Sequence, residues 1–402
     1  MTNLLFKEKI LFLGASYAQL PIIREAKRNG YYIITCDYLP QNPGHKIANE
    51  YYNVSTTDVE KIYQLAKKLR IDYIINYVSD PSAITAAFVA EKLGLPGNTY
   101  ESVGLLTNKD LFRQLLKDLG FIVPKFVSFG ERDNPKEKVK DLDFPLIVKP
   151  VDSSGSKGVS RVEDIHGLKK AVDKAFMFSK TKKLIVEEFI DNKGADLHGD
   201  GFVVDGELVF ISLGDHIFDE NSLTPVSTLW PTSLSEKLID EIIVQLGTII
   251  KRSGYKNGPV NIEVRVNSKG ENYIMEIGPR NGGNFVPQVI QYSTGFDFVQ
   301  ALIAVSTGNK PEIPKKYDQL PAAYYVIHSN EYGFLKNVII KNDLKKYIKE
   351  FHQYIEPGEK VMPFRGSNTA IGVIVMVFNQ YSEMLKVITN INDYIEVKVE
   401  KE

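Results

Sequence analysis

Two strand-like runs, each carrying one glutamate, limit the folds open to this chain more than any other stretch. Residues 260–266 and 273–277 mix β-branched or aromatic residues with polar ones, and the turn-forming segment 267–270, Asn-Ser-Lys-Gly, separates them. This pattern predicts a β-hairpin. In an antiparallel pair, Glu263 and Glu276 could lie side by side on one face of the sheet. Two neighbouring carboxylates repel each other and raise a pKa unless a cation sits between them.

The residues that follow the second run suit a bound phosphate. Glu276 leads through Gly278 and Pro279 to Arg280, and then to the glycine-rich segment 281–284. An arginine beside a carboxylate pair, with a glycine-rich loop behind it, fits Mg²⁺ together with a phosphate group. An ordinary surface hairpin with exposed glutamate and arginine side chains is an equal alternative from this stretch alone.

Length and composition indicate a multi-domain globular protein. A chain of 402 residues is long enough for two or three domains with ample core. The net charge of -1 gives no basic field that would favour a nucleic-acid partner. The single cysteine, Cys36, excludes an internal disulfide and suits a reducing compartment, where it is expected to be a small buried hydrophobe. We find no secretory signal and no membrane-length apolar run, and therefore expect a cytoplasmic protein without a membrane partner.

The N-terminal segment predicts a parallel sheet. A strand over 9–14, a helix over 19–29 and a strand over 31–37 form a βαβ unit. The turn after the first strand has one glycine, Gly14, where the dinucleotide fingerprint needs three. Because strand and helix alternate up to Gly97, we expect a Rossmann-like first domain without NAD. An NAD-dependent oxidoreductase is the poorer alternative.

Three further segments combine cations or glycines with predicted element ends. Thr107 and Asp110 form a capping-box pattern, which would place Lys109 in the first turn of a helix, near amides that favour anions. A strand over 144–149 carries Lys149 in an apolar run. The Gly/Ser loop at 152–158 follows at once; its amides could wrap phosphate oxygens, although it is not a Walker A loop. A strand over 183–190 ends in two acids, an aromatic and an aliphatic residue, which suits the edge of an adenine ring.

Taken in order, these motifs resemble the ATP-grasp superfamily of carboxylate–amine ligases. Order and spacing match over roughly residues 100–305, and the opening βα units resemble the first domain of that family. The layout is most similar to phosphoribosylglycinamide synthetase, the carbamoyl phosphate synthetase halves, biotin carboxylase and bacterial L-amino-acid ligases. The matching positions are Lys109, Lys149-Pro150, 152–158, 187–190, Glu263 and 276–280.

The resemblance implies a mixed α/β and α+β multi-domain fold. A Rossmann-like domain that precedes the ATP-grasp domain would span 1–99. The ATP-grasp domain would span 100–308, with a β-rich lid at about 121–190. A small C-terminal α+β domain would span 309–402.

The resemblance also implies ATP and Mg²⁺ as cofactors and a role for each matching position. Lys109 and Lys149 would contact the phosphates, Glu263 and Glu276 would bind one or two Mg²⁺ ions, and Arg280 with Lys157 would act on the transferred phosphoryl group. The other implied contacts are Ser153, Ser154, Gly155, Ser156 and Gly158 in a lid loop over the γ-phosphate, Glu187, Glu188, Phe189 and Ile190 at the adenine, and Asp196 at the ribose, with His198 and Asp200 as rivals.

One position departs from the family pattern. The family usually has Glu-x-Asn-Pro-Arg, and here Gly278 stands where the metal-binding asparagine is expected. A second Mg²⁺ would then depend on help from Asn261, Asn281 or Asn284.

The implied activity is an ADP-forming ligase that joins a small carboxylate to an amine through an acyl phosphate, in a possible homodimer. The alternatives are an ATP-dependent carboxylase of the purine-synthesis type and a nucleotide-binding module that has lost catalysis. Gly278 is the feature that favours the last of these.

Overall fold

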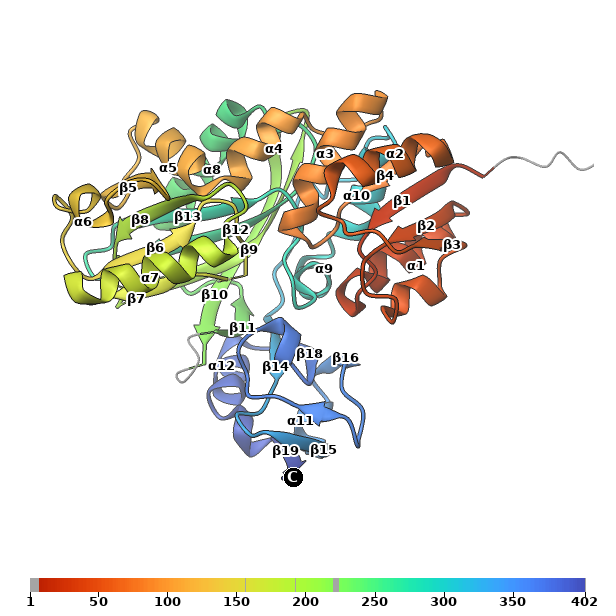
Figure 1. Cartoon of the computed structure of the whole chain (residues 1–402). Helices are drawn as coiled ribbons and strands as arrows, with labels where there is room; N and C mark the ends of the chain where they lie inside the picture. The colour runs from red at the N-terminus through yellow and green to blue at the C-terminus, as the bar shows by residue number, and fades with distance from the viewer. Residues whose placement is uncertain (1–6, 156, 192, 220–223, 402) are drawn as a thin grey trace, which may run out of the picture.

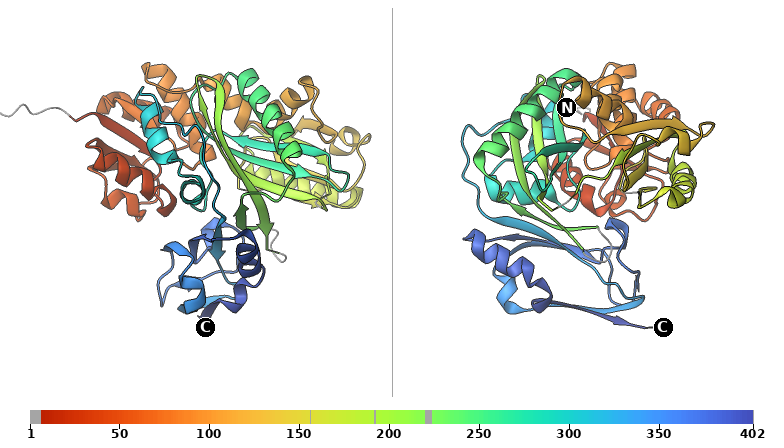
Figure 2. Two further views of the ribbon diagram at one scale, coloured as in Figure 1. Left: turned by 180° about the vertical axis from the view of Figure 1, so that it is seen from behind. Right: turned by 90° about the vertical axis from the view of Figure 1, so that its left-hand side faces the viewer.

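The computed structural model describes residues 7–155, 157–191, 193–219 and 224–401. Its first unit has a Rossmann-like layered structure (Figures 1 and 2). All its strands are parallel, in the order β3-β2-β1-β4. Cys36 is fully buried at the end of β2, as expected. The elements are β1 (Lys9–Leu13), α1 (Leu20–Arg28), β2 (Tyr32–Cys36), β3 (Glu50–Tyr52), α2 (Val59–Leu69), β4 (Tyr73–Ile75) and α3 (Asp80–Leu93).

Two consecutive helices, α4 (Tyr100–Thr107) and α5 (Lys109–Asp118), lead out of this unit, and they correct the predicted capping box. The Thr107 hydroxyl donates to the Val103 carbonyl at 2.8 Å, because Thr107 ends α4 instead of starting α5. Asn108 is the residue that caps α5, since its Oδ1 accepts from the amides of Asp110 at 3.1 Å and Leu111 at 3.2 Å. Lys109 nevertheless stands at the first position of α5, as predicted.

A small antiparallel sheet forms the segment predicted as the lid. Its order is β5-β8-β6-β7, and α7 covers an apolar core that includes Leu146, Val148 and Leu168. In Figure 1 this sheet lies on the side of the molecule opposite the Rossmann-like unit. The elements are β5 (Phe126–Gly130), α6 (Pro135–Lys138), β6 (Leu146–Pro150), β7 (Ser160–Val162), α7 (Ile165–Phe178) and β8 (Lys183–Glu188).

A second, larger antiparallel sheet runs through the rest of the chain in the order β13-β12-β9-β10-β11-β14-β18-β16. Pairing of β11 with β14 carries this sheet across the predicted boundary at 308, and the domain limits themselves stay predictions. The strands are β9 (Ala195–Val204), β10 (Glu207–Phe218), β11 (Pro225–Trp230), β12 (Gly258–Val266), β13 (Asn272–Gly278), β14 (Ala322–Ile327), β16 (Ile348–Gln353) and β18 (Gly372–Val377).

The remaining elements cover this sheet or extend the C-terminal part. None of the helices in the described ranges has the length and apolarity that a bilayer crossing requires. They are α8 (Glu236–Ser253), α9 (Val286–Thr294), α10 (Phe298–Ser306), α11 (Asn342–Lys345) and α12 (Tyr381–Thr389), together with a three-stranded sheet of β15 (Gly333–Ile340), β17 (Lys360–Val361) and β19 (Ile395–Glu400).

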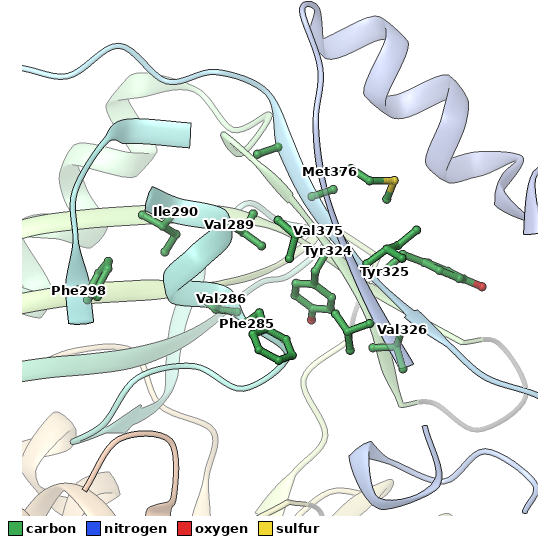
Figure 3. Close-up of a cluster of buried hydrophobic side chains, with 14 of the residues drawn as sticks. Phe285, Val286, Val289, Ile290, Phe298, Tyr324, Tyr325, Val326, Val375 and Met376 are labelled. Atoms are coloured by element: carbon green, nitrogen blue, oxygen red, sulfur yellow. The ribbon is translucent and has the colours of Figure 1, made fainter. Parts of the chain in front are cut away.

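One apolar cluster joins the units. Figure 3 shows side chains of α9 beside those of β14 and β18, and Phe298 of α10 on the other side of α9. The same cluster reaches Ile10 and Phe12 in the first unit. Within it, the centroid of the Phe298 ring lies 4.7 Å from that of Phe296 and 6.0 Å from that of Phe202, which belongs to β9. This cluster therefore joins the Rossmann-like unit, β9 and β10 of the large sheet, and the C-terminal part. The apolar residues of β12 and β13 belong to a second cluster under α8, and the small sheet has its own.

Replacing Phe298, which is 1% exposed, tests this shared core. Phe298→Ala should lower the free energy of unfolding by about 3–5 kcal/mol, because the lost aromatic contacts leave a cavity. The melting temperature checks this, with Val244→Ala as the control, since Val244 is 70% exposed on α8. Equal melting temperatures for the two variants would contradict the proposed role of the cluster.

Candidate functional site

The predicted hairpin is formed by β12 and β13, and it brings the two glutamates together. Glu263 and Glu276 are direct cross-strand partners. Glu263 is exposed to solvent and Glu276 is partly exposed. Desolvation of the Glu263 carboxylate and the neighbouring charge of Glu276 both act to raise the pKa of Glu263. The two carboxylates therefore lie where a cation would relieve their repulsion.

The hairpin belongs to a sheet with one polar and one apolar face. Because side chains alternate along a strand, Asn261, Glu263 and Arg265 of β12 share one face, while Ile262 and Val264 point to the core under α8. The cross-strand partners of the three polar residues on β9 are Asp200, His198 and Asp196, and those of Asn261 and Glu263 on β13 are Gly278 and Glu276. The residues expected to bind metal and ribose thus occupy one continuous face.

Asp200 is a structural anchor inside this face. It is fully buried and accepts hydrogen bonds from Asn261 Nδ2 at 2.8 Å, Asn281 Nδ2 at 3.1 Å and the Gly282 amide at 2.8 Å. Burial raises the pKa of Asp200 to about 6, against the effect of these donors. A Cβ at Gly282 would lie 3.0 Å from Asp200 Oδ1 and 2.8 Å from the Cβ of Val286, so a side chain there has no room. Asp200 therefore holds the glycine-rich loop in place.

His198 and Asp196, both considered for the ribose, have different surroundings. His198 is 7% exposed, with Nε2 at 2.9 Å from Asn261 Nδ2 and its ring stacked on His216. Burial lowers the pKa of His198 well below its ordinary value, which leaves the ring neutral. Asp196 pairs with Arg265 at 2.7 Å, and Arg265 also donates to the Ile190 carbonyl at 3.3 Å. Through Arg265, Asp196 is therefore linked to the segment that follows β8.

Glu187 is the centre of a buried charge cluster. Arg113 Nε donates to Glu187 Oε1 at 2.7 Å, and Lys149 Nζ contacts the other carboxylate oxygen. The side chains of Arg113 and Glu187 are each 2% exposed. The guanidinium also donates to the carbonyls of Ile274 at 2.9 Å and Met275 at 3.3 Å. Both oxygens of the Glu187 carboxylate are thus engaged inside the protein, where the side chain connects the small sheet with α5 and, through Arg113, with β13.

Arg113 was missed by the sequence analysis, although one signal was present. It stands four residues after Lys109 on α5, so both cations lie on the same helix face. Lys109 Nζ donates to the Ser153 carbonyl at 2.7 Å and lies 3.7 Å from Glu276 Oε2. Lys109 therefore bridges the Gly/Ser loop and the acidic hairpin.

A side-chain hydrogen bond links the described residues on either side of Ser156 in the Gly/Ser loop. The Ser153 hydroxyl donates to the Lys157 carbonyl at 2.7 Å, and Gly158 has a left-handed φ of +78°. A Cβ at Gly158 would also meet Pro150 at 3.0 Å, so the turn requires glycine here. Lys157 and Gly155 are exposed, and Ser153 and Ser154 are partly exposed. Ser156 lies outside the described residues.

At the end of β8, two of the expected adenine contacts already use their amides. The Glu188 amide donates to the Lys125 carbonyl at 3.0 Å, and the Phe189 amide donates to the Pro145 carbonyl at 2.9 Å. Arg161 lies over the Phe189 ring, 4.2 Å from its centroid. The predicted adenine contact at 187–190 stays a prediction, for which these two amides are already engaged, and Ile190 is 9% exposed.

Arg280 meets a residue from the first unit. Its Nε and Nη2 donate to the two carboxylate oxygens of Asp80 at 2.6 Å and 2.8 Å, and Nη1 donates to the Asn281 carbonyl at 2.9 Å. Asp80 carries no distinguishing signal in the sequence, because an acid at the start of a helix ordinarily serves the helix dipole.

The donor set fits Mg²⁺ bound together with phosphates. Within the described ranges, no group of three or more His, Cys, Asp and Glu side chains could hold a metal ion. Mg²⁺ usually keeps several waters and takes only one or two carboxylates plus substrate phosphates. Glu263 and Glu276 would supply those two carboxylates, and Lys109, 3.7 Å from Glu276, would be the cation for the phosphates.

Comparison with known proteins agrees with this geometry. Residues 142–288 match the family model described as the ATP-grasp domain, a range that contains Lys149, the Gly/Ser loop, both glutamates and Arg280. The chain therefore contains an ATP-grasp domain, and the resemblance stated from the motif order is confirmed.

Among curated relatives, the carbamoyl phosphate synthase large chain of Thermoanaerobacter sp. (strain X514) is 27% identical over 283 residues. The match covers 68% of this chain and 25% of that protein, so the chain spans about a quarter of its length.

Two solved structures cover nearly the whole chain. An L-amino acid ligase from Bacillus licheniformis has a TM-score of 0.82 at 21% identity and covers 98% of this chain and 99% of its own. A phosphoribosylglycinamide synthetase from Anaerococcus prevotii has a TM-score of 0.78 at 20% identity and covers 98% and 100%. At this identity the likeness shows the fold, and the predicted multi-domain α/β class is confirmed.

The charge cluster around Glu187 should make stability depend on pH. Burial acts to raise the pKa of Glu187, but Arg113 and Lys149 outweigh it and lower the pKa to about 2. Because this value lies below the ordinary 4.5, the ionised group stabilises the fold above about pH 4.5, and that contribution is lost as the pH falls toward 2.

Glu187→Gln should therefore cost about 3–5 kcal/mol near pH 7, since it leaves two buried cations without their partner. The difference from wild type should shrink as the pH falls below 4.5. Thermal unfolding at a series of pH values measures it, with Glu207→Gln as the control for an exposed ion pair. A constant difference from pH 7 down to pH 3 would count against the assignment.

Proposed function

We propose that the chain is an ATP- and Mg²⁺-dependent ligase that activates a small carboxylate as an acyl phosphate and joins it to an amine. The observation that carries the proposal is the meeting of Lys109 with the Glu263–Glu276 pair on the polar face of the large sheet. This arrangement offers two carboxylates to a metal and a cation to a phosphate at one place. The ATP-grasp domain match over residues 142–288 supports it.

The cations of the site would bind and orient the triphosphate. Lys109 is tied to the Ser153 carbonyl, so its ammonium stays between the Gly/Ser loop and Glu276. Lys149 is 12% exposed and shares Glu187 with Arg113, so the cluster has two cations for one carboxylate. A bound Mg²⁺ would neutralise part of the negative charge on the phosphates. Glu263 and Glu276 would hold it on the hairpin.

The reaction would need no nucleophilic side chain. A carboxylate oxygen of the substrate attacks the γ-phosphorus of ATP, and the bond to ADP breaks. The nitrogen of the amine then attacks the acyl carbon, the carbon–oxygen bond to phosphate breaks, and the nitrogen loses a proton. The contribution of the protein is charge placement and exclusion of water, because an acyl phosphate hydrolyses readily. The Gly/Ser loop is suited to cover the phosphates, since its turn begins beside Lys109.

The same site is compatible with two alternative functions. A carboxylase of the purine-synthesis type would take bicarbonate as the carboxylate. A nucleotide-binding module without catalysis is favoured by Gly278, which brings no side chain to the position beside Glu276. Binding of MgATP without ADP release, with every acceptor pair, would indicate such a module.

Two measurements test the proposal. Calorimetric titration with MgATP and MgADP measures nucleotide affinity, and a coupled assay of ADP release screens carboxylate and amine pairs. The screen includes glycine with phosphoribosylamine, pairs of amino acids, and bicarbonate. A protein that shows no affinity for adenine nucleotides in the presence of Mg²⁺ would refute the proposal.

Glu276→Ala should abolish turnover while the fold survives. We expect ADP release to fall about 100-fold or more, because the hairpin then offers one carboxylate instead of two to the cation. The melting temperature should stay close to that of wild type, since Glu276 is partly exposed. Glu236→Gln, an exposed acid on α8, is the control and should release ADP at the wild-type rate. Undiminished ADP release by Glu276→Ala would remove the metal assignment.

A further inference from the structure

We infer that Asp80 is a positioning residue of the active site, contributed by the Rossmann-like unit, and that Gly278 provides the space it needs. The inference rests on the proposed function, because Asp80 would act through Arg280. It adds a residue that lies outside the matched range 142–288 and outside every motif in the sequence.

The contact between Asp80 and Arg280 is bidentate and well shielded. The two residues are 200 positions apart, and their N–O distances are 2.6 Å and 2.8 Å. The side chains are 13% exposed for Arg280 and 18% exposed for Asp80. Paired N–H groups that meet both oxygens of one carboxylate fix the plane of the guanidinium as well as its position. An exposed ion pair between flexible side chains would not do this.

Gly278 explains how a carboxylate from another unit reaches this place. Residue 278 lies two positions after Glu276 on β13, on the same face and opposite Asn261. A Cβ at this position would lie 2.8 Å from Asp80 Oδ1 and 3.3 Å from Arg280 Nε. The backbone of Gly278 does not have a positive φ, so the conformation does not demand glycine. Space for the Asp80 carboxylate is the remaining reason.

The pair leaves Arg280 with a defined free edge. An arginine has five N–H donors, and Asp80 and the Asn281 carbonyl take three of them. The other two make no hydrogen bond within the described part of the chain, and they are available to a phosphoryl oxygen. Asp80 thus selects which donors of Arg280 remain for the substrate.

Asp80 also keeps Arg280 away from the metal-binding glutamates. Arg280 is close enough to Glu276 and Glu263 for their charges to act on each other. Without Asp80, the guanidinium would be drawn to these carboxylates and would compete with Mg²⁺ for them. The Asp80 contact therefore separates the phosphoryl-binding cation from the metal-binding anions.

A set of full-length variants tests this role. The variants are Asp80→Ala, Asp80→Asn, Gly278→Ala and the double variant Gly278→Ala/Asp80→Ala. Glu236→Gln is the matched control, because Glu236 has the same first position in α8 that Asp80 has in α3. Each is measured for melting temperature, for MgADP affinity by calorimetry, and for kcat and KM of ADP release with the acceptor pair found in the screen.

We expect Asp80→Ala to lower kcat about 10–100-fold while the MgADP affinity changes less than about threefold, because a misplaced reacting group costs about this much in rate. Asp80→Asn retains one acceptor oxygen and should fall between wild type and Asp80→Ala. Gly278→Ala should lower kcat by displacing Asp80. The double variant should be no slower than Asp80→Ala, since the two residues act on the same contact. The control should keep the wild-type kcat.

The outcomes separate the inference from the proposed function. A wild-type protein that releases no ADP rejects the proposed function, and the inference with it. Wild-type kcat in both Asp80 variants, or additive losses in the double variant, rejects the inference alone. A loss of MgADP affinity equal to the loss in kcat would also overturn it, because Asp80 would then serve nucleotide binding.

Discussion

The site depends on one buried carboxylate shared by two cations. Glu187 connects β8 to Lys149 on β6 and to Arg113 on α5, and Arg113 in turn binds two carbonyls of β13. A charge pair this deeply buried is stable only because each charged group has hydrogen-bond or ion-pair partners inside the protein. The small sheet, the helix with Lys109 and the acidic hairpin are thereby held around one point. The excess positive charge of the cluster then has a natural counterpart in an anionic ligand.

The alternation of β12 explains how a single strand can serve both core and site. Ile262 and Val264 are buried under α8, whereas Glu263 and Arg265 point to the opposite face. A shift of one residue in the pairing would exchange the two sets, so the apolar core fixes the register of the polar face. The hydrogen bond from the Gly282 amide to Asp200, together with the lack of room for a side chain at Gly282, likewise fixes the position of the loop after Arg280.

The sequence alone predicts those parts of the site that depend on neighbouring residues, but not those that depend on contacts between distant segments. The hairpin with Glu263 opposite Glu276 follows from alternation and a turn signal over fewer than 20 residues, and the structure has it. Arg113 and Asp80 could not be identified in this way, because their partners lie 74 and 200 positions away. The cap of α5 was misplaced by one residue, since a second helix ends directly before it.

The pairing of β11 with β14 has a consequence for how the chain can be divided. Strands β14, β18 and β16 complete a sheet that begins with the acidic hairpin. A fragment ending near 308 would present the open side of β11, with its amides and carbonyls bare, to any other extended chain. Buried apolar residues of β14 and β18 such as Tyr324 and Val375 also belong to the shared core. In the intact chain, β14 pairs with this side of β11 and covers it.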